Sequence, residues 1–120
     1  MNYWIFQSVP ERYDLRDKSN LHDGKDGWWY ATRYRKKMAI GDRVFFWMGG
    51  EKDIRGIYGV GKITSEPFED GSNHKVNIKV DKRFPHHLMI LKIAIGSNFL
   101  ISTKEGQAIL KLIGGGHEHV

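Results

Sequence analysis

The stretch from residue 28 to residue 41 combines large aromatic side chains with basic ones and contains no acidic residue. Aromatic rings offer flat faces on which nucleobases stack, and lysine and arginine attract phosphate groups. A segment that interleaves the two kinds of side chain therefore points to nucleic acid as a ligand. The aromatic members are Trp28, Trp29, Tyr30 and Tyr34, and the basic members are Arg33, Arg35, Lys36 and Lys37.

The whole chain is also basic, although only modestly. Its 120 residues include 19 Lys or Arg and 14 Asp or Glu, which gives a formal net charge of +5. This balance favours polyanionic partners, nucleic acid first and a membrane surface second. A basic protein that is merely soluble would have the same net charge. The clustering at residues 28–41 is therefore more informative than the total.

Catalytic chemistry finds little support in the sequence. There is no cysteine, so the chain has neither a thiolate zinc ligand nor a cysteine nucleophile. The six histidines do not form the i, i+4 pair of a zinc hydrolase, and Ser8 lacks the sequence of a nucleophile elbow. Gly59 and Gly61 lack the third glycine of a dinucleotide-binding loop. We therefore expect no enzyme activity, no metal and no cofactor.

The four tryptophans differ in what their surroundings predict. Trp4 lies in an apolar run and is assigned to the core. Trp28 and Trp29 are adjacent, and neighbouring side chains of an extended segment point opposite ways, so one can be an anchor while the other faces a site. Trp47 stands near the end of an apolar run, just before Gly49, and can be either a core residue or the wall of a pocket.

The elements that must position these residues are mostly strands. Apolar runs predict buried strands over residues 3–8, 43–48 and 88–95, and the glycine-rich run 56–64 predicts a bent strand. Residues 74–82 alternate apolar and polar side chains, as in a half-solvated strand. Residues 11–20 predict a turn and a short helix, and residues 28–38 can be a short helix or an irregular basic segment. Together these elements predict an α+β protein with a small, partly open mixed barrel.

A helix is expected near the carboxyl end of the chain. Ser102 and Glu105 form a capping box, residues 108, 109, 112 and 113 give an apolar stripe, and Gly114 is placed to end the helix. We therefore expect one domain over residues 1–113 and a flexible tail over residues 114–120. Because there is no apolar signal segment, no membrane-spanning run and no cysteine, we also expect a cytoplasmic protein without a membrane partner.

Four sequence blocks, taken in order, resemble the EVE domain family of the PUA-like superfamily, which also includes YTH and ASCH domains. The similarity covers about residues 2–113. The blocks are the aromatic strand YWIFQS (3–8), GWWYATRY (27–34), GDRVFFW (41–47) and GIYGVGKI (56–63). This resemblance implies a pseudo-barrel of about five or six mixed strands with short peripheral helices. It also implies a domain that binds nucleic acid and accepts one modified base in an aromatic pocket.

The resemblance implies roles for particular residues as well. Gln7 and Ser8 match the polar end of the family's first strand. Trp29 matches the aromatic wall of the pocket, with Trp28 as the alternative. Trp47 matches an aromatic position on the strand that follows Gly41-Asp42. Flanking phosphates would be bound by Arg33, Arg35, Lys36 and Lys37. The sequence departs from the family where many members have Asn-Tyr, since it has Arg33-Tyr34. Where YTH domains have a second cage tryptophan, it offers only His74 and Asn77.

The sequence therefore predicts a non-catalytic module that reads a modified base, in the first place a methylated one. YTH relatives read methylated adenine in RNA, and several EVE domains are proposed to read modified cytosine in DNA, so the nucleic acid and the modification stay open. The partner would be DNA or RNA, a nuclease or ATPase is a second candidate partner, and a monomer is favoured. The alternatives are a sensor of a free nucleobase or nucleoside and a protein-docking domain of a restriction or defence system.

Overall fold

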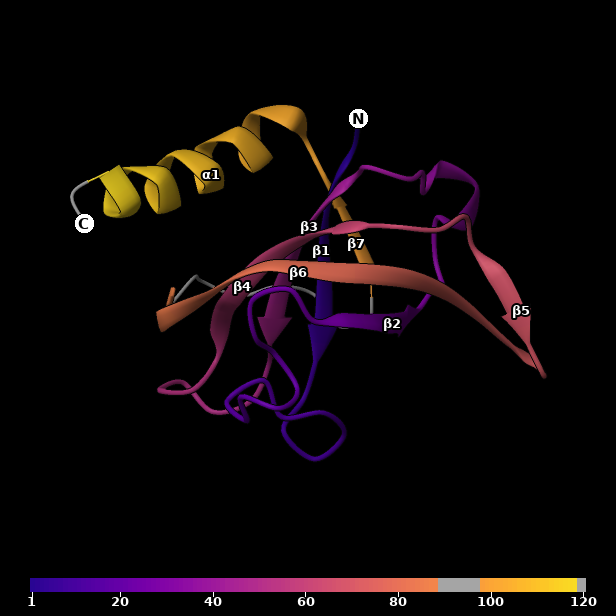
Figure 1. Cartoon of the computed structure of the whole chain (residues 1–120), viewed down its shortest axis with the longest axis horizontal. Coiled ribbons are helices and arrows are strands. Elements are labelled where there is room, and N and C mark those ends of the chain that lie inside the picture. The colour runs from indigo at the N-terminus through magenta and orange to yellow at the C-terminus, as the bar shows by residue number, and fades with distance from the viewer. Residues whose placement is uncertain (89–97, 119–120) are drawn as a thin grey trace.

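The computed structural model describes residues 1–88 and 98–118, which form a curled sheet with one α-helix beside it (Figure 1). The helical elements in these ranges are the 3-10 turn η1 (Arg35–Lys37) and helix α1 (Thr103–Glu118). None of the described helices is long and apolar enough to cross a membrane. The strands are β1 (Tyr3–Ser8), β2 (Asp26–Tyr30), β3 (Arg43–Met48), β4 (Gly56–Ile63), β5 (Phe68–Asp70), β6 (Asn73–Leu88) and β7 (Asn98–Ile101).

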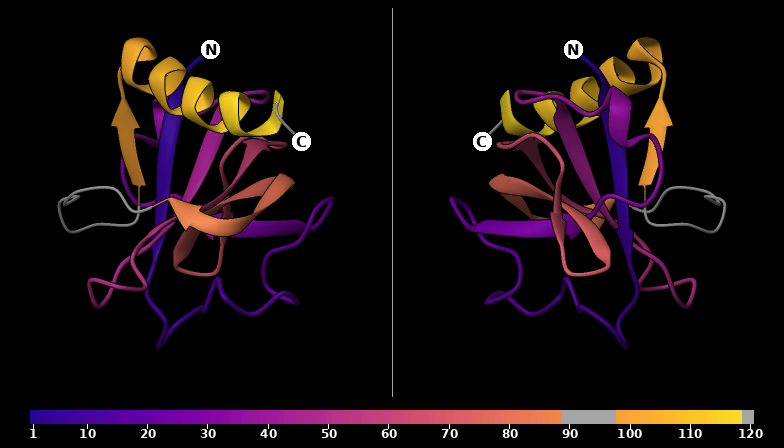
Figure 2. Two further views of the ribbon diagram at one scale, coloured as in Figure 1. Left: turned by 90° about the vertical axis from the view of Figure 1, so that its left-hand side faces the viewer. Right: turned by 90° about the vertical axis from the view of Figure 1, so that its right-hand side faces the viewer.

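The strands belong to one mixed sheet in the order β2-β6-β4-β3-β1-β7, and β5 pairs with β6 outside this path. β1 runs parallel to β3, and every other pairing among the described strands is antiparallel. The sheet curls into a partial barrel, and α1 crosses one end of it near the amino terminus (Figure 2). This arrangement confirms the predicted α+β fold, a mixed-strand pseudo-barrel with peripheral helices, although the described sheet has seven strands where five or six were expected.

Alternation along the strands divides the core into two clusters, one on each face of the sheet. On β3, Phe46 belongs to the cluster that contains Trp29, whereas Phe45 and Trp47 belong to the opposite one. On β1, Trp4 and Phe6 face the first cluster, while Tyr3 and Ile5 face the second. A strand with both faces covered is apolar throughout, which explains the continuous apolar runs of the sequence.

Strand β4 bends where glycine allows β6 to come close. A Cβ atom on Gly61 would lie 2.1 Å from the backbone oxygen of Lys79, and one on Gly59 would lie 2.7 Å from that of Lys82. The register between the two strands shifts at both places. Any larger side chain would collide with the neighbouring backbone, so the predicted bent strand is confirmed.

Helix α1 begins with the predicted capping box. The backbone N–H of Glu105 donates to Ser102 Oγ, and the N–H of Ser102 donates to a Glu105 carboxylate oxygen, both at 3.0 Å. Gly106 allows the helix to rest on β1, because a Cβ atom there would lie 2.3 Å from the ring of Tyr3.

The predicted apolar stripe of this helix is wrong in part. Ile109 packs against the sheet as predicted, but Ala108 and Leu112 are exposed, and Leu110, which was not predicted, packs beside Ile109. The close contact at Gly106 fixes which side of α1 meets β1. The spacing of apolar residues alone does not reveal which side this is. The helix also continues to Glu118, so the expected end at residue 114 is wrong. The domain limit at residue 113 and the flexible tail stay predictions.

Other segments also differ from expectation. Residues 11–20 form turns without the predicted short helix, because their side chains bond to neighbouring backbone groups, as Asp14 and Asp17 do. Residues 28–38 resolve into the end of β2, an irregular stretch and η1. The half-solvated strand predicted for residues 74–82 continues to Leu88. The strand predicted for residues 88–95 lies outside the described residues except for Leu88.

Candidate nucleic-acid interface

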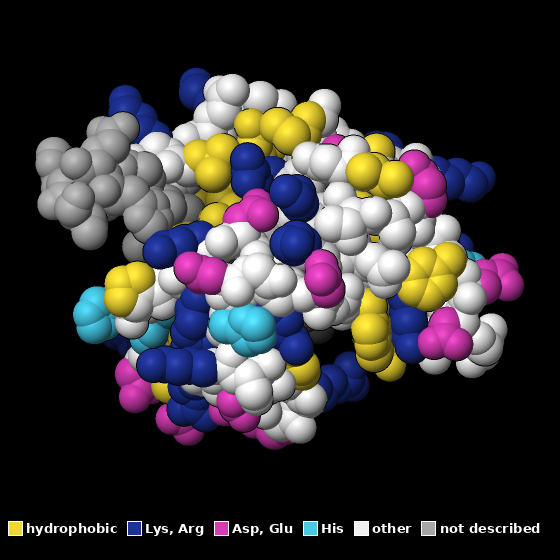
Figure 3. Space-filling view, viewed as in Figure 1, with side chains coloured by type: hydrophobic (Ala, Val, Ile, Leu, Met, Phe, Trp, Pro, Cys, Tyr) yellow, Lys and Arg dark blue, Asp and Glu magenta, His cyan; other side chains and the backbone are white. Residues whose placement is uncertain are grey.

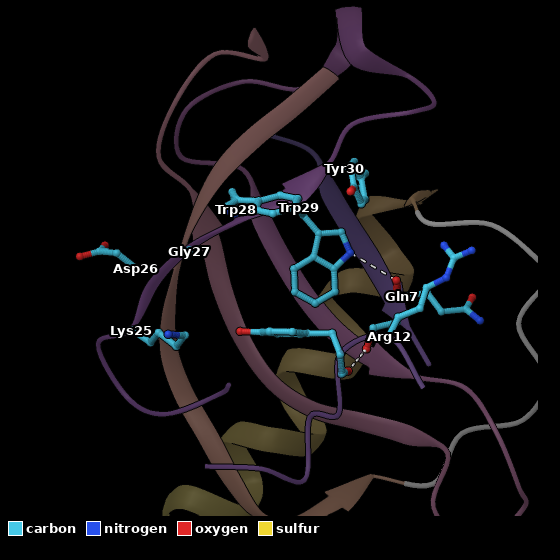
Figure 4. Close-up of a pocket in the computed structure, with 10 residues that line it drawn as sticks. Gln7, Arg12, Lys25, Asp26, Gly27, Trp28, Trp29 and Tyr30 are labelled. Carbon is cyan, nitrogen blue, oxygen red and sulfur yellow. Dashed lines mark hydrogen bonds between the residues drawn. The ribbon is translucent and has the colours of Figure 1, made fainter. Parts of the chain in front are cut away.

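A pocket of about 320 Å³ opens between the carboxyl end of β1, strand β2 and the loop that connects these two strands (Figure 4). Its volume lies at the lower end of the range for small-molecule sites, and a single base or nucleoside is of that class. The pocket is lined by Gln7, Ser8, Arg12, Tyr13, Lys25, Asp26, Gly27, Trp28, Trp29 and Tyr30.

Trp29 is the fixed aromatic wall of this pocket. Only 8% of the residue is exposed, and its ring packs against Phe6 and Phe46, with centroids 6.1 and 5.4 Å away. Its Nε1–H donates to the backbone oxygen of Gln7 at 3.3 Å (Figure 4). The indole is therefore held from behind by the core and from the side by β1, which confines it to one orientation.

Tyr13 is the second aromatic wall, and our sequence reasoning did not identify it. Its ring meets Trp29 edge to face, at 5.9 Å and 88° between planes. Its hydroxyl donates to the backbone oxygen of Asn20 at 2.8 Å. Burial, and secondarily the nearby Asp17 carboxylate, raise the pKa of Tyr13, so this hydroxyl stays protonated at neutral pH. The segment that carries Tyr13 is polar and aperiodic, and nothing in its pattern indicated a pocket.

Arg83 of β6 anchors the loop that carries this tyrosine, and it too was missed. Its Nη1 donates to the backbone oxygens of Leu15 and Leu21 at 2.7 and 2.9 Å, and its Nη2 donates to that of Arg16 at 3.1 Å. One guanidinium thus satisfies three carbonyl groups in the described loop. These partners lie more than 60 positions away in the chain, where no local motif connects them.

The two polar residues at the end of β1 contribute in different ways. Ser8 Oγ donates to the backbone oxygen of Tyr13 at 2.9 Å, which leaves its lone pairs to accept hydrogen bonds. Gln7 lines the pocket but follows the alternation of β1 toward the opposite face, in register with Trp47. Its backbone oxygen receives the Trp29 bond, while its side-chain Oε1 is buried without a partner among the described residues.

The structure does not place Trp47 at this pocket. Trp47 is buried in the cluster on the other face of the sheet, together with Ile5, Phe45 and Ile57. On β3 it is Phe46 that packs against Trp29. The assignment of Trp47 to the base pocket is therefore corrected: strand alternation turns its side chain away from the site.

Trp28 and Trp29 separate as neighbouring residues of a strand should. Trp29 is buried, whereas Trp28 is 48% exposed and lies at the rim of the pocket. The ring of Trp28 meets that of Tyr30 edge to face at 5.1 Å, and the Nζ atom of Lys75 lies 3.9 Å from its centroid. The anchor is thus Trp29, and the exposed partner is Trp28.

The predicted phosphate-binding residues are exposed but do not line the pocket. After β2 the chain runs back along β1: the N–H of Thr32 donates to Asn98 Oδ1 at 3.0 Å, and Asn2 Nδ2 donates to the Lys37 backbone oxygen at 3.0 Å. At about 3.3 Å per residue, Asn2 lies about 20 Å along the strand from Ser8. The basic side chains are Arg33, Arg35, Lys36 and Lys37.

Two other cations stand at the pocket itself, and sequence reasoning did not single them out. Arg12 is exposed on the loop after β1, and Lys25 is half-buried just before β2. Both line the pocket, whereas the four basic residues that follow β2 do not. Within the described residues, no group of three or more His, Asp or Glu side chains is placed to hold a metal ion.

The fold is thus a curled mixed sheet with an aromatic pocket at the end of its first strand. The EVE domain family matches residues 2–111, nearly the whole chain, and the chain belongs to this family. This membership is consistent with a PUA-like module that binds RNA or DNA. No curated protein matches the chain.

Two solved structures share the fold. The first is Rpa0253 from Rhodopseudomonas palustris, determined by NMR, with a TM-score of 0.63 and 18% identity over 96% of this chain and 94% of that one. The second is the crystal structure of Atu2648 from Agrobacterium tumefaciens, with a TM-score of 0.60 and 17% identity over the same shares. At this level of identity the likeness shows the fold alone.

Proposed function

We propose that the protein is a non-catalytic module that binds DNA or RNA and accepts one modified base in the pocket lined by Tyr13 and Trp29. The observation that carries this proposal is the pocket itself, which is base-sized, aromatic on two sides and open at a rim with cations. A base inside a duplex cannot reach such a pocket, so the target would be flipped out or unpaired at a cost of a few kcal/mol.

Stacking and hydrogen bonding have separate tasks in this pocket. Stacking on an aromatic ring contributes about 1–3 kcal/mol and hardly distinguishes one base from another. Base identity must come from polar groups along the edge, for which Ser8 offers an acceptor and the Lys25 ammonium a donor. A buried methyl group adds about 0.8 kcal/mol, or roughly fourfold in affinity. Stronger discrimination requires that the unmodified base leave a polar group unpaired.

The charged residues would act on the backbone of the nucleic acid. Arg12, which is exposed at the pocket, would bind the phosphate next to the bound base, and the basic residues after β2 would bind phosphates further along. These contacts are independent of sequence and weaken as salt displaces them. A nuclease or ATPase partner, the monomeric state and the cytoplasmic location stay predictions.

The test is fluorescence anisotropy with one labelled oligonucleotide in unmodified, methyl-adenine, methyl-cytosine and hydroxymethyl-cytosine versions, as DNA and as RNA, at two salt concentrations. We expect one modified version to bind more tightly than its unmodified counterpart. Binding without any preference would reduce the protein to a general nucleic-acid binder. Equally tight binding of a free modified nucleoside would favour the sensor.

The matched variants are Tyr13→Ala and Tyr13→Phe. Removing the ring should abolish the preference for the modified base and leave the salt-dependent part of binding. Tyr13→Phe keeps the ring and loses only the bond to Asn20, so it should retain the preference. Trp29→Ala is a poorer test, since emptying a buried tryptophan site costs about 3–5 kcal/mol of stability and confuses folding with binding.

A further inference from the structure

The outer face of β2, β6 and β5 carries large aromatic side chains in positions where a sheet usually shows polar ones. Trp28 is 48% exposed, Tyr30 39% and Phe68 38%. The space-filling view shows hydrophobic side chains near the β5 end of the molecule, at the right, with a basic side chain between them (Figure 3). We call these three residues, together with Lys75, the aromatic platform.

Strand register shows that the platform is one continuous surface. Lys75 of β6 pairs with Tyr30 on one side and with Phe68 on the other, and paired residues share a face of the sheet. Trp28 lies two residues before Tyr30 and therefore on the same face. The Lys75 side chain is only 16% exposed, because it lies over Trp28 and bonds to Asp70 at 2.5 Å.

From this arrangement we infer that the platform is a second binding surface, which stacks the unpaired nucleotides next to the base held in the pocket. This inference rests on the proposed function and extends it, because it makes the preferred ligand single-stranded beside the modified base. Trp28 and Tyr30 line the pocket rim as well as the platform, so a strand leaving the pocket meets their rings first. Phe68 lies outside the pocket and belongs to the platform alone.

The size and charge of the platform fit a short stretch of nucleic acid. From Tyr30 to Phe68 there are two strand spacings, about 10 Å. A base that stacks face to face on an aromatic ring covers about one ring, so the platform offers about one stacking position for each exposed ring. Lys75 neutralises Asp70, and Asp26 opposes Lys79 in the register. The chain then continues from Tyr30 into the basic residues after β2, where the phosphates of the same strand would lie.

The test compares Trp28→Ala and Phe68→Ala with the native chain, using labelled single-stranded DNA of about twelve nucleotides with 5-methylcytosine at its centre. We expect each variant to lose about tenfold in affinity, which is the usual effect of removing one stacking ring. Trp28→Phe should retain binding, because a phenyl ring still stacks. Leu112→Ala, at an equally apolar position of α1 that is 68% exposed, should change nothing. Binding of 5-methylcytidine monophosphate, which has no flanking base, should be the same in native protein and Phe68→Ala.

A direct optical readout is also available. Among the four tryptophans only Trp28 is exposed, so quenching of tryptophan fluorescence by acrylamide reports mainly on the platform. Single-stranded DNA should protect this fluorescence, and the same oligonucleotide paired with its complement on both flanks should protect it less.

The outcomes separate the two proposals. If both alanine variants bind the flanked oligonucleotide as the native chain does, the platform is overturned and the pocket reader stands. If the variants lose affinity but no modified base is preferred, the platform stands and the modified-base reader is overturned. If no oligonucleotide binds at low salt, both fail. Protection that appears without DNA as protein concentration rises would assign the platform to a second copy of the chain instead.

Discussion

The two ends of β1 differ in how completely their polar groups are satisfied. At the amino end, the buried Asp42 carboxylate accepts hydrogen bonds from the backbone of Asn2, the indole of Trp4 and the backbone of Ala39, at 3.0, 3.0 and 3.1 Å. At the carboxyl end, Ser8 and the rim of the pocket keep acceptors and donors facing open space. A closed network stabilises the fold, whereas an open one can bind a ligand. Variants at the first end should therefore change stability, and variants at the second should change binding.

The largest effect is expected for Asp42→Ala. This change removes the shared acceptor of three N–H groups around a buried site. We expect it to lower the free energy of unfolding by about 3–5 kcal/mol, measured by urea denaturation. Asp42→Asn keeps one good acceptor and should lose less. An Asp42→Ala protein of native stability would show that the amino end of β1 is not held by this carboxylate.

Arg83→Met tests the open end through the loop that carries Tyr13. It removes the donors for three backbone carbonyls and keeps the unbranched stem of the side chain. We expect a several-fold loss of affinity for the preferred oligonucleotide and faster hydrogen exchange confined to residues 11–22, with native exchange in β1 and β3. Since Arg83 is a positioning residue, Arg83→Lys should restore part of the exchange protection. Uniformly faster exchange across the sheet would instead mean that Arg83 supports the whole fold.

A double variant, Arg35→Ala with Lys37→Ala, tests whether the basic residues after β2 contribute to binding without selecting the base. Both side chains are exposed and neither lines the pocket, so we expect them to contact phosphates and not the base. We expect weaker binding to modified and unmodified oligonucleotides alike. The slope of log K against log salt should become shallower by up to about two, roughly 0.7–0.9 per lost contact. A changed base preference would place these residues in the pocket.

Strands were easier to predict from the sequence than the site. The bounds of the strand at residues 43–48 follow directly from its apolar run between two glycine turns, and the run at residues 3–8 ends shortly before Pro10. The identity of the aromatic wall needs more, because alternation says only that Phe46 and Trp47 face opposite ways. Which of them meets Trp29 depends on pairing with β1, a contact distant in sequence. No periodic pattern connects Tyr13 with Arg83. Only in the folded chain does Arg83 bind the loop that carries Tyr13.

The smallest effect is expected where α1 begins, above the closed end of β1. Hydrogen bonds from Ser102 lower the pKa of the exposed Glu105 carboxyl below its ordinary value, so the ionised form is the one that the capping box holds. The stability this group contributes is therefore present above its ordinary pKa and is lost as the pH falls through the lowered one. Circular dichroism at 222 nm should show α1 fraying over that acidic range in the native chain, and Ser102→Ala should fray already at neutral pH. Because α1 meets β1 at Tyr3 and not at Ser8, neither change should alter base preference. A shift in preference would show that the two ends of β1 are coupled.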